Sequence, residues 1–432
     1  MERSSFGQDT LIAVSANAQE TAINTYQTLD TGMLCDIKNR PDLEAQREDD
    51  RGEATGKEEA NRIYDLGNRS GKVLSFPKMQ IQHLAFAAAY VLGNCESADV
   101  GVDGRIHTIQ PIQGDLDAAR SNPSFTAAVR SGINLEKRRF ASMFGDGLKL
   151  SLKKDSWAQL DLNVAGTGKH ESNALKDTIT AAWNATTLAL TKAIAGADAA
   201  NRLANVHQVR ALDPVGGQWV DVVCTEASGA TPCVLAITAP GEAATSTTYE
   251  VIYNQKEADP YDWCVFPNRV EEDPIRVSDF LIKLGGKWDG SALTGGHQMS
   301  AEINSLEWSA QNGLKPASAP GSGTYKYANQ GLRSGRTQTI TIERRFLDLI
   351  LAQRFFDVEY FTLYAKAVGE SYESGRYYTG EIIWPRVAVK GRPVSVGDGN
   401  RNVEGVQLDV YQDDIYGSVI VKCENMVTTY AA

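Results

Sequence analysis

The stretch GLKLSLKKDSWAQLDLNVAGTG, residues 147–168, decides the fold class. Leucines and polar residues alternate over 148–152, and apolar and polar residues alternate again over 160–164. A period of two is typical of a strand with one buried face, because successive side chains of a strand point to opposite sides. The polar residues between the two runs, 154–156, therefore predict an antiparallel hairpin.

The same alternation recurs in the C-terminal part of the chain. It predicts strands at 299–308, 337–343, 359–367, 380–390, 403–411 and 417–423. In the first of these strands the apolar positions change parity between Ile303 and Leu306, which predicts a bulge near Asn304. We therefore expect a mainly β protein.

A helix is predicted over residues 77–92. Pro77 suits the first position of a helix and Gly93 suits the position just past its end. The apolar residues at helical spacing are Ile81, Leu84, Ala85, Ala88 and Leu92. We expect this face to pack on the strands, with Leu84 at its centre and His83 on the exposed side.

A second helix is predicted over residues 346–358. Its apolar residues, which we also expect to face the core, are Leu347, Ile350, Leu351, Phe355 and Val358.

Residues 37–72 form a polar segment without a helix or strand period. Their carboxylates are Asp42, Glu44, Glu48, Asp49, Asp50, Glu53, Glu58 and Glu59. A loop of this length inside a compact chain is usually functional or disordered. We expect a long extended arm, with a solvated loop as the alternative.

The middle of the chain, 170–275, differs in composition from both flanks. Residues 171–207 are rich in Ala and Thr and predict helix, and short strands are expected at 218–223, 233–238 and 247–254. This pattern predicts an inserted or appended α+β subdomain between two strand-rich blocks, 1–169 and 276–432.

Composition excludes several classes of protein. Against 43 basic residues the chain has 54 acidic ones, a net charge of -11, which disfavours a grip on nucleic-acid phosphate. The longest nearly apolar run, 84–92, is far shorter than the ~20 residues of a membrane helix. Residues 1–9 do not resemble a secretion signal, so we expect synthesis in a cytoplasm.

Motifs for catalysis, cofactors and metals are incomplete. Gly166–Lys169 resembles a phosphate-binding loop, but Asn163 stands where the first Gly is required, and His170 replaces the Ser or Thr. His170 and Glu171 match the start of an HExxH zinc motif, but Ala174 stands where the motif requires its second His. We predict no catalytic, cofactor-binding or metal-binding residues.

The six cysteines include no CxxC pair, and we expect buried free thiols. Cys224 and Cys233 flank a turn-rich segment, which leaves open whether they pair.

The order of these elements resembles that of the major tail tube proteins of tailed bacteriophages. The resemblance covers about residues 1–168 and 276–432. It rests on the arm followed by the helix SFPKMQIQHLAFAAAYVLG, on the hairpin at 147–168, and on the terminal strands TQTITIERRFLDL, EIIWPRVAVKG and NVEGVQLDVYQDD. It implies a β-sandwich with a flanking helix.

The resemblance also implies a function. Such proteins are structural virion proteins that form rings, commonly hexameric, which stack into a tube for DNA ejection into the host. It implies self-association, contacts with tape measure, tail terminator and distal tail proteins, and DNA that passes without specific binding. Because 170–275 exceeds a minimal tube subunit, it is either an outer decoration or a second tube-like module. The second case implies a trimer with pseudo-sixfold form.

Within this family the arm is expected to contact an adjacent ring, and polar residues of alternating strands are candidates to line the channel. The chosen residues are Asp161, Glu302 and Asp409, with an outer surface as the alternative. Two other classes stay open, namely a tail-tip or carbohydrate-binding adhesion protein and, less favoured, a β-sandwich hydrolase.

Overall fold

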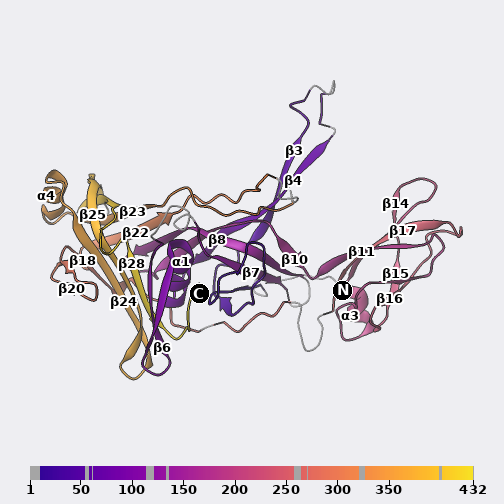
Figure 1. The fold of residues 1–432 in the computed structure, drawn as a ribbon, viewed down its shortest axis with the longest axis horizontal. Helices are drawn as coiled ribbons and strands as arrows, with labels where there is room; N and C mark the ends of the chain where they lie inside the picture. Colours follow the sequence, from indigo (N-terminus) through magenta and orange to yellow (C-terminus); the bar gives the residue numbers. More distant parts are fainter. Residues whose placement is uncertain are drawn as a thin grey trace. The chain divides into compact units, whose positions relative to one another are not determined.

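Antiparallel strands make up most of the chain in the computed structural model (Figure 1). The structure describes residues 10–53, 58–60, 62–112, 121–132, 136–256, 264–269, 271–320, 326–397 and 401–431. Residues 1–9, expected to hold no secretion signal, and residues 54–57 and 61 of the expected arm lie outside this part.

The chain separates into two compact units. Unit 1 comprises Met1–Leu11, Ala128–Arg139 and His170–Phe266, and unit 2 comprises Ile12–Ala127, Phe140–Lys169 and Pro267–Ala432. Residues 267–275, which the sequence placed with the subdomain, therefore group with unit 2.

Six strands of unit 2 pair in the order β4–β9–β8–β22–β23–β27. Their bounds are Ile63–Phe76 (β4), Gln159–Gly166 (β9), Glu136–Lys153 (β8), Ile303–Gln311 (β22), Thr337–Arg345 (β23) and Arg401–Val410 (β27). The β8–β9 hairpin is confirmed, and the register shift between Ile303 and Ser305 confirms the bulge at Asn304.

A second run of strands has the order β18–β24–β25–β28–β6–β5. The bounds are Phe280–Leu284 (β18), Phe361–Glu373 (β24), Arg376–Gly391 (β25), Ile420–Asn425 (β28), Gly104–Pro111 (β6) and Gly93–Val100 (β5). The long strand β25 pairs with both β27 and β28 and so links the two runs. Trp308 of β22 and Trp384 of β25 meet edge to face with their ring centroids 5.3 Å apart, so the two runs are in contact at these side chains.

The remaining strands of unit 2 are short or lie at its edges. They are β1 (Leu11–Val14), β2 (Thr31–Met33), β3 (Asp42–Asp49), β7 (Ser124–Ser131), β19 (Lys287–Trp288), β20 (Leu293–Thr294), β21 (His297–Gln298) and β26 (Val394–Gly397). β1, β7 and β8 contribute residues to both units.

Helix α1 (Ile81–Leu92) is buried along its whole length. It ends as predicted at Gly93, whose φ of 96° is the left-handed conformation that favours glycine. It begins at Ile81 and not at Pro77. The prediction for His83 is wrong, because this ring is fully buried, stacks on Phe76 at 4.2 Å, and has its pKa lowered to about 3 by burial.

Buried polar side chains satisfy the C-terminal carbonyls of α1. Asn312 donates from Nδ2 to the Val91 carbonyl at 2.9 Å, and Arg336 donates from Nη2 to Val91 and Leu92 at 3.0 and 3.1 Å. Burial lowers the pKa of Arg336 to about 9. The last carbonyls of a helix lack partners within the helix, so these contacts make full burial of α1 possible.

The expected arm at 37–72 is a β-hairpin, so the prediction that it has no strand period is wrong. β3 pairs with β4 from Asp42↔Gly71 to Asp49↔Ile63. In Figure 1 this hairpin extends away from the rest of unit 2. β3 reads as irregular in the sequence because most of its side chains are exposed on both faces.

Helix α4 (Ile350–Phe356) lies inside the second predicted helix, but its environment differs from the prediction. Only Leu351 and Ala352 of this helix are buried. Four of the five residues expected in the core are instead exposed, namely Leu347, Ile350, Phe355 and Val358, and only Leu351 is buried as predicted.

Unit 1 corrects the prediction of helix over 171–207. Its elements are β10 (His170–Ser172), β11 (Ala174–Ala182), β12 (Thr187–Ala189), α3 (Ala199–Ala204), β13 (Val206–Leu212), β14 (Trp219–Asp221), β15 (Cys224–Ala227), β16 (Val234–Ile237) and β17 (Ser246–Asn254). β11 pairs with β17 along its full length and buries a shared core around Tyr249 and Val251. Cross-strand pairing thus overrides the helix propensity of the alanines.

Among the described helices, none combines the length and the apolar character needed to cross a membrane.

Candidate functional site

The six-strand run of unit 2 has one polar and one apolar face. Strand register places one residue from each strand in a row, and this row is Ser75, Asp161, Lys149, Ser309, Thr339 and Asp409. All six are partly or fully exposed. The neighbouring row, Gln159, Ser151, Glu307, Thr341 and Gln407, is exposed in the same way. We call the surface that these two rows form the polar face.

The opposite side of the same strands is buried at its centre. Its central row is Phe76, Leu160, Leu150, Trp308, Ile340 and Leu408, of which none is more than 1% exposed. Because the apolar face fixes the register, a shift by one residue would bury every charge of the polar face. The polar face is therefore held in a single arrangement.

Charges of both signs lie side by side on the polar face. Lys149 pairs with Glu307 at 3.0 Å, and Lys390 pairs with Asp409 at 3.3 Å. Asp161 accepts a hydrogen bond from Ser75 at 2.6 Å. The polar face thus presents carboxylates without being acidic throughout.

Two of the three predicted channel residues, Asp161 and Asp409, lie in one row of the polar face, and Glu302 does not. Glu302 precedes the bulge at Asn304, and its side chain is 17% exposed and bound to Arg344. The choice of Glu302 as a polar-face residue is therefore wrong, because Glu302 lies just before β22, where strand alternation does not fix its direction, and its carboxylate binds Arg344 and His297.

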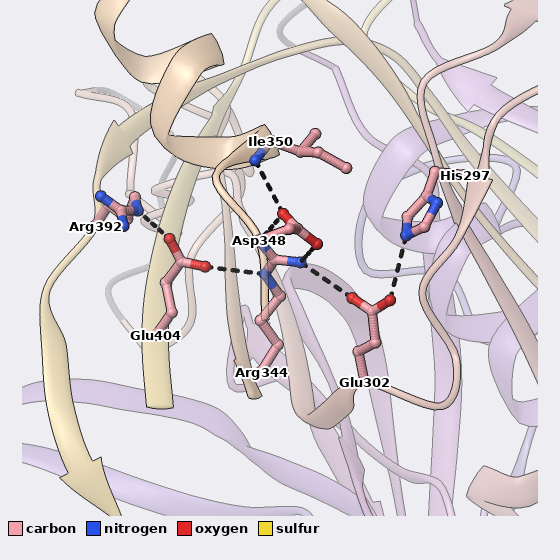
Figure 2. Close-up of polar contacts among 7 residues, drawn as sticks. All are labelled: His297, Glu302, Arg344, Asp348, Ile350, Arg392 and Glu404. Carbon is pink, nitrogen blue, oxygen red and sulfur yellow. Dashed lines mark hydrogen bonds and ion pairs between the residues drawn. The ribbon is translucent and has the colours of Figure 1, made fainter. Parts of the chain in front are cut away.

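Glu302 belongs to a buried ion network around Arg344, shown in Figure 2. Arg344 is 1% exposed and donates to Glu404 at 2.9 Å, to Glu302 at 3.0 Å and to Asp348 at 3.0 Å. Arg392 forms an ion pair with the second carboxylate oxygen of the fully buried Glu404. The hydrogen bond from Arg344 lowers the pKa of Asp348, which in turn accepts from the backbone N–H of Ile350 at 2.9 Å.

This network was not predicted, although the sequence contains a signal for it. Arg344 has the same parity as Ile340 and Ile342 in its strand, and Glu404 has the same parity as Val406. Arg344 and Glu404 are also cross-strand partners. Opposite charges at apolar positions of two strands predict a buried ion pair.

Some side chains of this network could also serve as metal ligands. Ligand atoms of His297, Glu302 and Asp348 lie within 4.8 Å of one another. Arg344 already binds both carboxylates, so a cation there would have to displace a buried guanidinium. We assign this group a structural role.

The hairpin β3–β4 carries the predicted arm carboxylates. Seven of the eight are exposed, namely Asp42, Glu44, Glu48, Asp49, Glu53, Glu58 and Glu59. The exception is Asp50, which is 1% exposed. Glu53 accepts a hydrogen bond from Tyr64 at 2.9 Å, which ties the two strands together near their ends.

Cys224 and Cys233 form no disulfide with each other. Cys233, Cys264 and Cys423 are buried, and the other three are partly exposed.

Comparisons with known proteins add no relative: no protein-family model matches the chain, and no curated protein sequence matches it.

Proposed function

We propose that this chain is a structural virion protein that polymerises as stacked rings into the tube of a phage tail, the conduit for genome delivery. The rings would be hexameric, or trimeric with pseudo-sixfold form. In this proposal the chain has no catalytic role, and its partners are further copies, DNA in transit, and the tape measure, tail terminator and distal tail proteins.

The observation that carries the proposal is the polar face. It runs without interruption across six strands, while the reverse of the same strands is buried. Repeated around a ring by symmetry, such a face forms a polar channel wall, and each side chain becomes a belt.

The chemistry of the polar face suits the passage of DNA. Lys149 lies directly across from Asp161 and is paired with Glu307, so its charge is balanced locally. Asp409 is balanced in the same way by Lys390. A wall with balanced charges offers no concentrated cationic patch for phosphates, which favours sliding over binding.

The extended hairpin supports assembly through contacts outside its own unit. Its apolar residues Ile63 and Leu66 are exposed, so they are not buried against their own unit. Within the tube proposal, this hairpin joins one ring to the next.

Electron microscopy of the purified full chain tests assembly directly. We expect rings or tubes with an open centre. A variant with residues 46–67 replaced by Asn-Gly keeps the paired base Ala45↔Asn68 and should remain folded while losing tube growth. Tubes of normal length from this variant would exclude the hairpin as the joint, and a monomer that binds glycans would favour the adhesion alternative.

A second experiment tests the channel wall. Asp161→Lys with Asp409→Lys should leave tails intact and slow DNA ejection, because cations would then face phosphate. Glu96→Lys with Asp99→Lys, at exposed positions on β5, is the matched control. Unchanged ejection, with both new lysines open to amine labelling in assembled tails, would place the polar face outside the tube.

A further inference from the structure

The end of the β3–β4 hairpin exposes apolar side chains that its own unit does not cover. Ile63 is 73% exposed, Tyr64 37% and Leu66 50%. Glu48 is the cross-strand partner of Tyr64, so a carboxylate lies beside the apolar group. We call residues 44–49 and 63–66 the arm tip.

A second apolar surface surrounds helix α4. Seven large side chains there are between 37% and 72% exposed, namely Leu347, Leu349, Ile350, Phe355, Phe356, Val358 and Tyr360. Monomeric proteins seldom expose so many large apolar groups within one short segment, and a group of this kind marks an interaction site. We call these seven residues, with Arg345 and Arg386, the α4 face.

The two apolar surfaces also carry charged side chains of opposite sign. Arg386 stacks over Tyr360 at 4.1 Å, and among the described residues neither it nor Arg345 has a carboxylate partner. On the arm tip, Glu44 and Glu48 have no cationic partner in the described part of the chain. The arm tip has an excess of negative charge, with Glu44, Glu48, Asp49 and Asp65 against Arg47, whereas the α4 face carries Arg345 and Arg386.

Within one copy of the chain the arm tip and the α4 face do not contact each other. The arm tip and α4 both belong to unit 2, and Figure 1 shows them at opposite ends of that unit. A contact between two different patches of the same chain is heterologous, and such contacts generate closed rings or open filaments.

We infer that the arm tip of one copy docks on the α4 face of a second copy. The apolar residues of the arm tip pack on Phe355, Phe356 and Val358, and its glutamates approach Arg345 and Arg386. This inference rests on the proposed self-assembly and names the joint.

Photo-crosslinking of the full chain tests the joint. A photoreactive phenylalanine analogue at Leu66 should crosslink two copies, and mass spectrometry should place the partner peptide within 345–360 or at Arg386. The same probe at Val215, which is 96% exposed in unit 1, is the control and should not crosslink to the α4 face.

Charge reversal supplies the second measurement. Glu44→Lys with Glu48→Lys should weaken self-association, measured by sedimentation velocity, by about tenfold or more, and so should Arg345→Glu with Arg386→Glu. All four changes together should restore association. These side chains are exposed or partly exposed, so folding should be preserved, which circular dichroism checks.

The outcomes separate the two proposals. Crosslinks from Leu66 to other peptides in a chain that still forms tubes would overturn the joint alone. Crosslinks to the α4 face without rings or tubes would overturn the tube and keep the joint. A chain that stays monomeric at high concentration would overturn both.

Discussion

Helices α1 and α4 have similar sequence patterns and opposite environments. Both have apolar residues at helical spacing, yet all of α1 is buried and only Leu351 and Ala352 of α4 are. Strands of both runs and the polar groups of Asn312 and Arg336 enclose α1. At the start of helix α4, Asp348 accepts a hydrogen bond from the Ile350 N–H and forms an ion pair with Arg344 (Figure 2).

The difference shows that apolar spacing defines a face of a helix without saying what covers it. For α1 the covering is in the same chain, and for α4 we infer that it comes from a second copy. The following predictions test this contrast, starting with the largest expected effect.

Removing Arg344 should cost the most stability. Arg344→Met leaves the buried Glu404 and the carboxylates of Glu302 and Asp348 short of a cation, so we expect a loss of about 3–5 kcal/mol in a urea titration. Arg51→Met is the control, because the Arg51 side chain is 74% exposed and its 3.2 Å ion pair with Asp49 lies at the surface, so the change should cost about 1 kcal/mol or less. Equal losses for both variants would contradict the role of the network.

Truncation inside α1 should come next. Leu84 is 1% exposed, so Leu84→Ala should cost about 2–5 kcal/mol of unfolding free energy. Leu347→Ala makes the same change at a side chain that is 64% exposed and should change stability by about 0.5 kcal/mol or less. A small loss at Leu84 would show that the burial of α1 contributes little.

The carboxylates at the starts of the two helices should respond to pH in opposite directions. Glu272 accepts from the Gln82 N–H at 3.1 Å, and burial raises its pKa from 4.5 to about 7. The folded state therefore holds this proton more tightly, and the resulting stability is present below about pH 4.5 and lost as pH rises through about 7. Arg344 lowers the pKa of Asp348, so its contribution is present above 3.8 and is lost as pH falls through the lowered pKa.

Glu272→Gln should remove the first of these dependences. Between pH 4.5 and 8 the wild type should lose up to about 3 kcal/mol more than the variant, as measured by urea titration at each pH. Glu271→Gln changes the neighbouring exposed carboxylate and should follow the wild type. Parallel curves for all three proteins would contradict the raised pKa.

The smallest effect on stability is expected on the α4 face. Phe356 is 72% exposed, so Phe356→Ala should change the unfolding free energy by about 0.5 kcal/mol or less, whereas Phe86→Ala inside α1 should cost about 3–5 kcal/mol. The same Phe356→Ala should weaken self-association in sedimentation. A large loss of monomer stability would show that Phe356 belongs to a core.

Several elements were predictable because their pattern is local. The β8–β9 hairpin follows from alternation around a polar turn, and the bulge at Asn304 follows from one change of parity. Gly93 marks the end of α1 because the chain there takes a left-handed conformation. The end of α1 was therefore predictable, and its start, where Pro77 suggested an earlier residue, was not.

The errors concern features that depend on distant partners. β11 forms because β17 pairs with it, although its alanines favour helix. His83 is polar yet fully buried because Phe76 and the backbone of Gln80 accommodate its ring. Glu302 lies just before β22, and its carboxylate binds Arg344 of the neighbouring strand β23.

The sequence by itself determined that the protein is mainly β and that a helix ends at Gly93. It also located the strands β8, β9, β22, β23, β24, β25, β27 and β28, since these features arise from the spacing of apolar residues along a short segment. Only the tertiary structure decided that Asp161 and Asp409 share a row, that Arg344 is enclosed by three carboxylates, and that the α4 face is open. Each of these depends on register and packing between segments far apart in the chain, which local spacing does not encode.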